Sequence, residues 1–223
     1  MIHVESYLFQ LIEKMQQQFG SRLLYVGLQG SYLRGEATDN SDLDVMIVLD
    51  GLALSDLAAY RLILQSMGHF DKSCGFICSK EDLANWNPLE ICHLLNSTKD
   101  YYGTLRPLVP SYTSEDAGNF VKLSLNNLYH ELCHRAVHGQ PNNTAAALPG
   151  MYKGTFFILQ NLHYLKSGTF LPSKAQLLEA LKGSDRAVLQ HAMELSEGMK
   201  YDADKSFALL FDWCQQTMAA LAD

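Results

Sequence analysis

GSYLRGEATDNSDLDVMIV, residues 30–48, is the stretch of the sequence that decides the fold. It is preceded by a short apolar run, Leu23 to Leu28, and it ends inside a second one, Leu43 to Leu49. Apolar runs of this length, bounded by turn-forming residues, are typical of buried strands. Between them, Gly30-Ser31 opens a short helical stretch that leads into the turn-rich segment ATDNS. The stretch therefore predicts a strand, a helix and a second strand, with polar side chains at both junctions.

Both junctions carry residues that suit phosphate chemistry. The backbone N–H groups and small hydroxyl of Gly30-Ser31 suit a phosphate, because glycine lets the phosphate approach the backbone closely. Asp42 and Asp44 are two residues apart at the second strand, so their side chains point to the same side. Two carboxylates side by side repel each other unless a cation lies between them, and Mg²⁺ favours such oxygen ligands. A lone Asp-x-Asp is more often a solvated strand end, but the combination predicts a site for a metal-bound nucleotide that loses pyrophosphate.

The same run carries a resemblance to a known family. The pattern G-S-x-x-R-G, followed by S-D-x-D and an apolar strand, resembles the signature of the DNA polymerase β-like nucleotidyltransferases, and their minimal and antibiotic-modifying branches are the most similar. The resemblance implies that Gly30 and Ser31 bind the triphosphate, that Arg34 lies near it and that Ser41 supports the loop. It also implies that the two aspartates ligate Mg²⁺.

The segments around this run predict the rest of a first domain. Val4 to Phe19 and Leu52 to Met67 have the periodicity of helices, and Ser73 to Cys78 is typical of a third strand, although Gly75 weakens it. We expect an α+β fold in which residues 1–110 form a nucleotidyltransferase-type mixed sheet with flanking helices.

The remaining residues, 111–223, predict an all-helical bundle domain. Helical patterns alternate there with breakers such as Pro141-Asn142-Asn143 and Leu148-Pro149-Gly150. The segments NNLYHELCHRAVHG and LKSGTFLPSKAQLLEAL follow SCGFIC in an order similar to that of the kanamycin nucleotidyltransferase branch. In that branch the helical domain helps to form the acceptor site, and two subunits share the active site. The resemblance thus implies an acceptor and dimerisation domain, and a homodimer.

The family pattern contains one more acidic residue than this sequence offers. These enzymes generally carry a third carboxylate on the next strand, where the alignment places Cys74. A thiol is a poor Mg²⁺ ligand, and Asp71 lies just before that strand. Three alternatives stay open: Asp71 is the third metal ligand, the site works with two protein carboxylates, or the site binds nucleotide without catalysis.

The general base for the acceptor hydroxyl has two candidates. In the kanamycin branch a glutamate on the first long helix of the second domain takes this role. The comparable position here is His130, with Glu131 beside it. Histidine is half-titrated near neutral pH, and a glutamate needs only modest tuning. The alternative is that His130, His134 and His138, spaced four residues apart, form one surface face of a helix.

The composition describes an ordinary globular protein and excludes several classes. The hydrophobic fraction is 48%, the charged fraction is 18%, and the formal net charge of −7 comes with scattered Lys and Arg, which argues against bulk nucleic acid as a partner. No apolar run approaches the ~20 residues that span a bilayer, and the first residues lack the layout of a secretory signal. The five cysteines form no CxxC pair. We therefore expect a cytoplasmic protein with free thiols.

These observations together predict a Mg²⁺-dependent nucleotidyltransferase. The expected reaction moves a nucleoside monophosphate from a Mg-NTP, with ATP as the default donor, to a hydroxyl of a small molecule such as an aminoglycoside-like compound. One alternative is an antitoxin-like nucleotidyltransferase that modifies another protein. The other is a catalytically silent nucleotide-binding module, which the cysteine in the third-carboxylate position favours.

Overall fold

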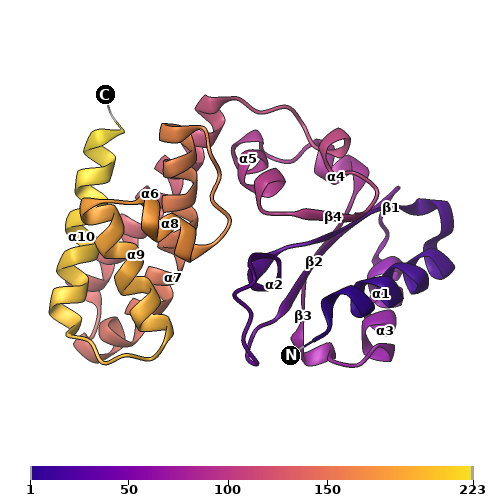
Figure 1. The fold of residues 1–223 in the computed structure, drawn as a ribbon, viewed down its shortest axis with the longest axis horizontal. Helices are drawn as coiled ribbons and strands as arrows, with labels where there is room; N and C mark the ends of the chain where they lie inside the picture. The colour runs from indigo at the N-terminus through magenta and orange to yellow at the C-terminus, as the bar shows by residue number, and fades with distance from the viewer. Residues whose placement is uncertain (1, 222–223) are drawn as a thin grey trace. The chain divides into compact units, whose positions relative to one another are not determined.

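The computed structural model describes residues 2–221, and this part of the chain divides into two compact units, the first ending at Tyr112 and the second beginning at Thr113. The first unit combines a sheet with helices, and the second is built from helices. Figure 1 shows both units, coloured from the N-terminus to the C-terminus. The expected fold class, a mixed sheet with flanking helices followed by an all-helical bundle, is confirmed.

One four-stranded sheet runs through the described part of the first unit. Its strands are β1 (Leu23–Leu28), β2 (Leu43–Leu49), β3 (Ser73–Ser79) and β4 (Lys99–Tyr102), in the order β3-β2-β1-β4. β1 pairs antiparallel with both β2 and β4, whereas β2 and β3 run parallel. The sheet is therefore mixed, and β2, which begins just after Asp42 and contains Asp44, lies in its interior.

The two faces of the sheet bury different helices, because side chains alternate along each strand. On one face, Val45 and Ile47 join a core with residues of α1 (Val4–Phe19) and α3 (Leu54–Ser66). On the other face, Met46 and Val48 pack with a smaller core that includes Tyr25, Cys78, Leu83 and Leu105. Each fully buried apolar side chain contributes roughly 1.5–3 kcal/mol to this packing. Asp44 belongs to the second face, since it is two residues before Met46.

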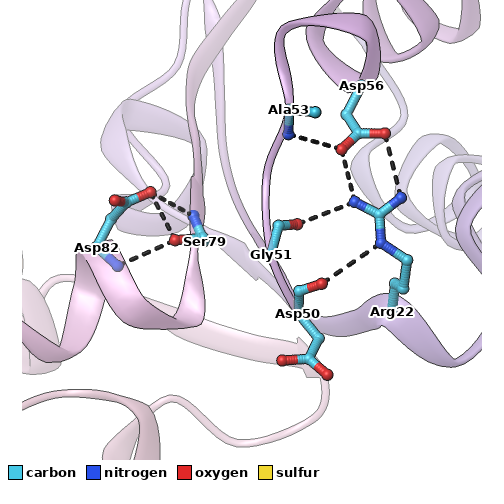
Figure 2. A network of polar contacts seen from close by, with 7 residues as sticks. All are labelled: Arg22, Asp50, Gly51, Ala53, Asp56, Ser79 and Asp82. Carbon is cyan, nitrogen blue, oxygen red and sulfur yellow. Dashed lines mark hydrogen bonds and ion pairs between the residues drawn. The ribbon is translucent and has the colours of Figure 1, made fainter.

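An arginine fork fixes the end of the sheet where β2 finishes. The guanidinium of Arg22 donates two hydrogen bonds to Asp56, of 2.5 and 3.2 Å, and one of 3.0 Å to the carbonyl of Gly51 (Figure 2). The N–H of Ala53 donates to the same carboxylate at 2.8 Å. The hydrogen bond from Arg22 is the main reason that the pKa of Asp56 lies below its ordinary value. Planar two-pronged pairs of this kind fix orientation as well as distance, so the start of β1 is tied to the start of α3.

Two short helices after β3 did not figure in the sequence interpretation, although their N-terminal signals are present. Ser79 and Asp82 form a reciprocal capping box at the start of α4 (Lys80–Ala84), with the Asp82 N–H donating to Ser79 Oγ at 3.0 Å (Figure 2). Asn87 caps α5 (Pro88–Asn96), whose first residue is a proline. Both are recognised start patterns of helices. The first unit thus has two helices over the face that carries Asp44.

The second unit contains α6 (Ser114–His138), α7 (Pro141–Ser167), α8 (Lys174–Ala180), α9 (Gly183–Ser196) and α10 (Ala203–Ala220). The helices pack around a common core that includes fully buried Leu125, Tyr152 and Trp213. No helix in residues 2–221 is long and apolar enough to cross a membrane.

The break expected around Pro141 is confirmed, since α6 ends at His138 and α7 begins at Pro141, whereas the break expected at Pro149 was wrong. Pro141 is the first residue of α7, and Pro149 lies inside that helix. A proline has no N–H, so inside a helix it leaves the carbonyl four residues earlier without its usual donor. For Pro149 this is the carbonyl of Ala145. The hydroxyl of Tyr201 donates to this carbonyl at 2.8 Å. The helix therefore continues because a side chain from outside it replaces the missing N–H.

Candidate active site

The first glycine of the motif lies directly against the second aspartate. Gly30 begins α2 (Gly30–Arg34) with φ of +70°, and a Cβ at this position would collide with the Asp44 carboxylate. The preceding residue, Gln29, donates its N–H to the Asp44 carbonyl at 2.9 Å. A left-handed φ favours glycine in any case, and the close approach leaves no space for a side chain. The strand–helix–strand motif therefore folds so that Gly30 and Asp44 share one corner of the sheet.

Cys74 lies on the other side of the same aspartate. The parallel pairing of β2 and β3 sets Asp44 opposite Cys74, which is where the sequence comparison placed the missing carboxylate. Burial, together with the carboxylates of Asp44 and Asp42, raises the pKa of the Cys74 thiol. Asp42 is exposed just before β2, and Asp44 is half-buried. The corner thus brings together two carboxylates and a thiol.

The donor set fits a divalent cation only in part. Within residues 2–221, no group of three or more His, Cys, Asp or Glu side chains is arranged to hold a metal ion. Asp71 is exposed in a short 3-10 turn, Phe70–Lys72, and does not join Asp42 and Asp44 in such a group. Mg²⁺ usually keeps several water or phosphate oxygens beside one or two carboxylates. The two aspartates suit that mode of binding, in which a nucleotide supplies the remaining ligands.

The other motif residues support the loop between α2 and β2. The Oγ of Ser41 accepts a hydrogen bond of 2.9 Å from the N–H of Thr38, which closes the turn before the aspartates. Ser31 is half-buried in α2, and its carbonyl accepts the N–H of Glu36 at 2.9 Å. The ammonium of Lys72 donates to the carbonyl of Asp39. The loop is therefore held from both ends and from the turn before β3.

Arg34 belongs to a charged group that the sequence reasoning did not anticipate. Its Nε donates to Glu36 Oε2 at 2.9 Å, and the two side chains are 15% and 22% exposed. His93 of α5 is near this pair: burial, reinforced by the positive charge of Arg34, lowers its pKa to about 4. No local motif marks His93, because its role depends on how α5 packs against the rest of the unit. The guanidinium is held by a carboxylate, and its charge helps to keep His93 neutral at physiological pH.

Replacing His93 by Gln should flatten the dependence of stability on pH. Between pH 6.5, the ordinary pKa, and about 4, the unfolded chain binds a proton that the folded protein excludes. The free energy of unfolding should therefore fall as the pH drops through this window, by at most about 3.4 kcal/mol from this residue, of which at most about 2 kcal/mol is lost above pH 5. Urea unfolding of both proteins at pH 7.5 and pH 5 measures the difference. Equal losses in the wild type and the variant would remove His93 as the cause.

The general-base candidates lie in the second unit, on α6. His130 and Glu131 are both exposed, and Glu131 Oε1 forms an ion pair with Arg135 Nη2 at 2.8 Å. The rings of His130, His134 and His138 follow one another along the helix, with centroids 6.4 and 5.0 Å apart. All three are exposed. This arrangement agrees with the alternative of a histidine face on the helix surface.

Comparisons with known proteins identify the class. Residues 8–73, from α1 to the start of β3, match the family model of the nucleotidyltransferase domain. The resemblance seen in the motif is therefore confirmed for this part of the first unit. No curated protein sequence matches the chain significantly.

A solved structure extends the similarity to both units. Spectinomycin adenyltransferase from Enterococcus faecialis, solved with ATP and spectinomycin, is 13% identical to the chain with a TM-score of 0.58. The match covers 95% of this chain and 99% of that one. At this identity the likeness shows a shared fold.

Proposed function

We propose that this protein transfers a nucleoside monophosphate, from ATP by default, to a hydroxyl group of a small molecule. The observation that carries the proposal is the corner where Gly30 lies against the Asp44 carboxylate, within the segment that matches the nucleotidyltransferase domain. At such a corner a phosphate can come close to the backbone, and the carboxylates that could bind a cation lie beside it. The similar structure, solved with ATP and spectinomycin, supports the choice of donor and of a small-molecule acceptor.

The proposed roles follow from chemistry and position. Gly30 and Ser31 would bind the triphosphate, and Asp42 and Asp44 would hold Mg²⁺. When bound, the cation would offset the negative charge of the phosphates. The acceptor oxygen forms a bond to the α-phosphorus, the bond from that phosphorus to the bridging oxygen of the β-phosphate breaks, and pyrophosphate leaves.

The hydroxyl proton passes to a general base. The resemblance offers Glu131 and His130 for this role. The exposed position of both residues on α6 leaves either side chain accessible.

The direct test is pyrophosphate release from each of the four common NTPs with Mg²⁺, in the presence of spectinomycin, of kanamycin or of no acceptor. We expect release that depends on both ATP and one acceptor, with a product heavier than the acceptor by one AMP unit. Release without an acceptor would indicate hydrolysis instead. ATP binding without any release would favour a second candidate, a silent nucleotide-binding module, which the Cys74–Asp44 pairing supports.

Gly30→Ala and Gly35→Ala form a matched pair that tests the corner itself. Both glycines have φ of +70°, but only at position 30 would the new Cβ meet Asp44, whereas the space around Gly35 is open. Each substitution should cost about 1–2 kcal/mol of stability, because a left-handed backbone disfavours any side chain. Only Gly30→Ala should also weaken ATP binding and slow transfer, since it displaces the carboxylate. Calorimetry and transfer rates measure the two effects, and equal rates in the two variants would contradict the assignment.

A further inference from the structure

Two aromatic side chains form a fixed, partly exposed pair in the first unit. The rings of Phe76 and Trp86 stack with centroids 5.9 Å apart and an interplanar angle of 20°. The indole N–H of Trp86 donates to Glu90 Oε2 at 2.6 Å, which fixes the orientation of the ring. Trp86 is nevertheless 37% exposed. We name Phe76, Trp86 and Glu90 the aromatic platform.

The platform lies on the sheet face that carries the candidate active site. Phe76 pairs with Met46 across the β3–β2 ladder, and Cys74 pairs with Asp44 one step earlier. Residues two apart on a strand point to the same face and are separated by about 7 Å. Phe76 is therefore the next side chain along the face after Cys74, and the platform continues directly from the corner.

The platform also lies on the side of Asp44 away from the proposed triphosphate. Gly30 meets the Asp44 carboxylate from the β1 and α2 side, while Cys74 and Phe76 belong to β3, on the other side of β2. In an in-line displacement, the attacking oxygen and the leaving group are on opposite sides of the phosphorus. If the pyrophosphate leaves from Gly30-Ser31, the acceptor hydroxyl arrives from the β3 side.

The chemistry of the platform defines the kind of acceptor. Aromatic faces attract the apolar face of a ring and, through their quadrupole, a positive charge. The Glu90 carboxylate beside the indole adds a negative charge at the same place. We propose that Phe76, Trp86 and Glu90 form the acceptor subsite, and that it takes a cyclic compound carrying a positively charged amine. This inference rests on the proposed transfer reaction.

Tryptophan fluorescence tests occupancy of the platform independently of turnover. The sequence has two tryptophans, and Trp213 is fully buried in the second unit, so acrylamide quenching reports mainly on Trp86. We expect spectinomycin to protect Trp86 from acrylamide. Spermidine, a linear cation, and myo-inositol, an uncharged ring, should protect much less. Protection by ATP instead of spectinomycin would assign the platform to the nucleobase and overturn the proposal.

Kinetics of Trp86 variants supply the second arm. Trp86→Ala should raise the KM for spectinomycin by roughly threefold to tenfold, with the KM for ATP unchanged. Trp86→Phe keeps an aromatic ring, so its KM for spectinomycin should lie between those of Trp86→Ala and the wild type. Phe9→Ala is the matched control, because Phe9 is a 64% exposed aromatic residue on α1, over the other sheet face.

The two arms separate failure of the subsite from failure of the proposed function. Transfer with an unchanged acceptor KM in Trp86→Ala would overturn the subsite and leave the reaction intact. Protection of Trp86 by spectinomycin without any transfer would support the subsite and refute the reaction. Neither protection nor transfer would overturn both.

Discussion

Asp44→Asn should reduce nucleotidyl transfer by at least about a thousandfold, the largest effect that we expect from a single substitution. Asparagine keeps the shape of the side chain but removes the negative charge that would hold Mg²⁺ in the proposed site. The Asp44 side chain is half-buried between Gly30 and Cys74, and the backbone hydrogen bond from Gln29 does not depend on its charge. The melting temperature should therefore stay close to that of the wild type.

Pyrophosphate release with ATP, Mg²⁺ and an active acceptor measures the loss. Asp42→Asn should behave in the same way. Asp50→Asn is the matched control, because Asp50 is an exposed carboxylate just after the opposite end of the same strand. Full transfer by Asp44→Asn would refute the assignment of the motif.

Cys74→Asp should increase transfer by roughly tenfold to a hundredfold if the site works with two carboxylates. The new carboxylate would stand opposite Asp44 in the β2–β3 ladder, where it completes the ligand set. Three acidic groups without a cation repel one another, so the variant should melt at a lower temperature than the wild type in EDTA. Mg²⁺ should restore its melting temperature more than it raises that of the wild type. The thermal shift reports on the site even when no acceptor is present.

Cys74→Asn provides the control, since it has the same shape without the charge and should show neither effect. A loss of transfer in Cys74→Asp would mean that another group already completes the site. In that case Asp71→Asn or Glu131→Gln should instead lower the rate of transfer by about 10²–10⁴-fold, as removal of a general base or ligand does. If all of these variants stay active, Asp42 and Asp44 are the only carboxylates of the protein that the reaction needs.

The strands and the corner between them could be predicted because local sequence determines them. Leu23 to Leu28 and Leu43 to Leu49 are short apolar runs between turn-forming residues, which favours buried strands, and the structure has β1 and β2 at these residues. The strand at Ser73 to Ser79 survives Gly75, where a Cβ would collide with the backbone of Val45. The glycine that weakened the prediction is what lets the two strands approach.

β4 could not be predicted, because its stability comes from its partner. Lys99–Tyr102 is short, begins with two exposed charged residues, and forms a strand by pairing with β1. Its Asp100 accepts the hydroxyl of fully buried Tyr25 at 2.6 Å, a contact between residues 75 apart in the sequence. The pair of His93 with Arg34 is of the same kind, since α5 and α2 are brought together only by the fold.

The contact between Tyr201 and the Ala145 carbonyl links two positions of the chain in evolutionary terms. The bond from Tyr201 is solvent-exposed, and a typical hydrogen bond contributes about 0.5–1.5 kcal/mol net, so proline at position 149 is tolerated best where a tyrosine already stands at position 201. If a lineage acquires the tyrosine first, the later change to proline lowers the stability of the protein only slightly. In the reverse order, the protein with proline and without the tyrosine is less stable. Related sequences that keep Pro149 should therefore keep a hydrogen-bond donor at position 201, and those with another residue at 149 should be free to vary there.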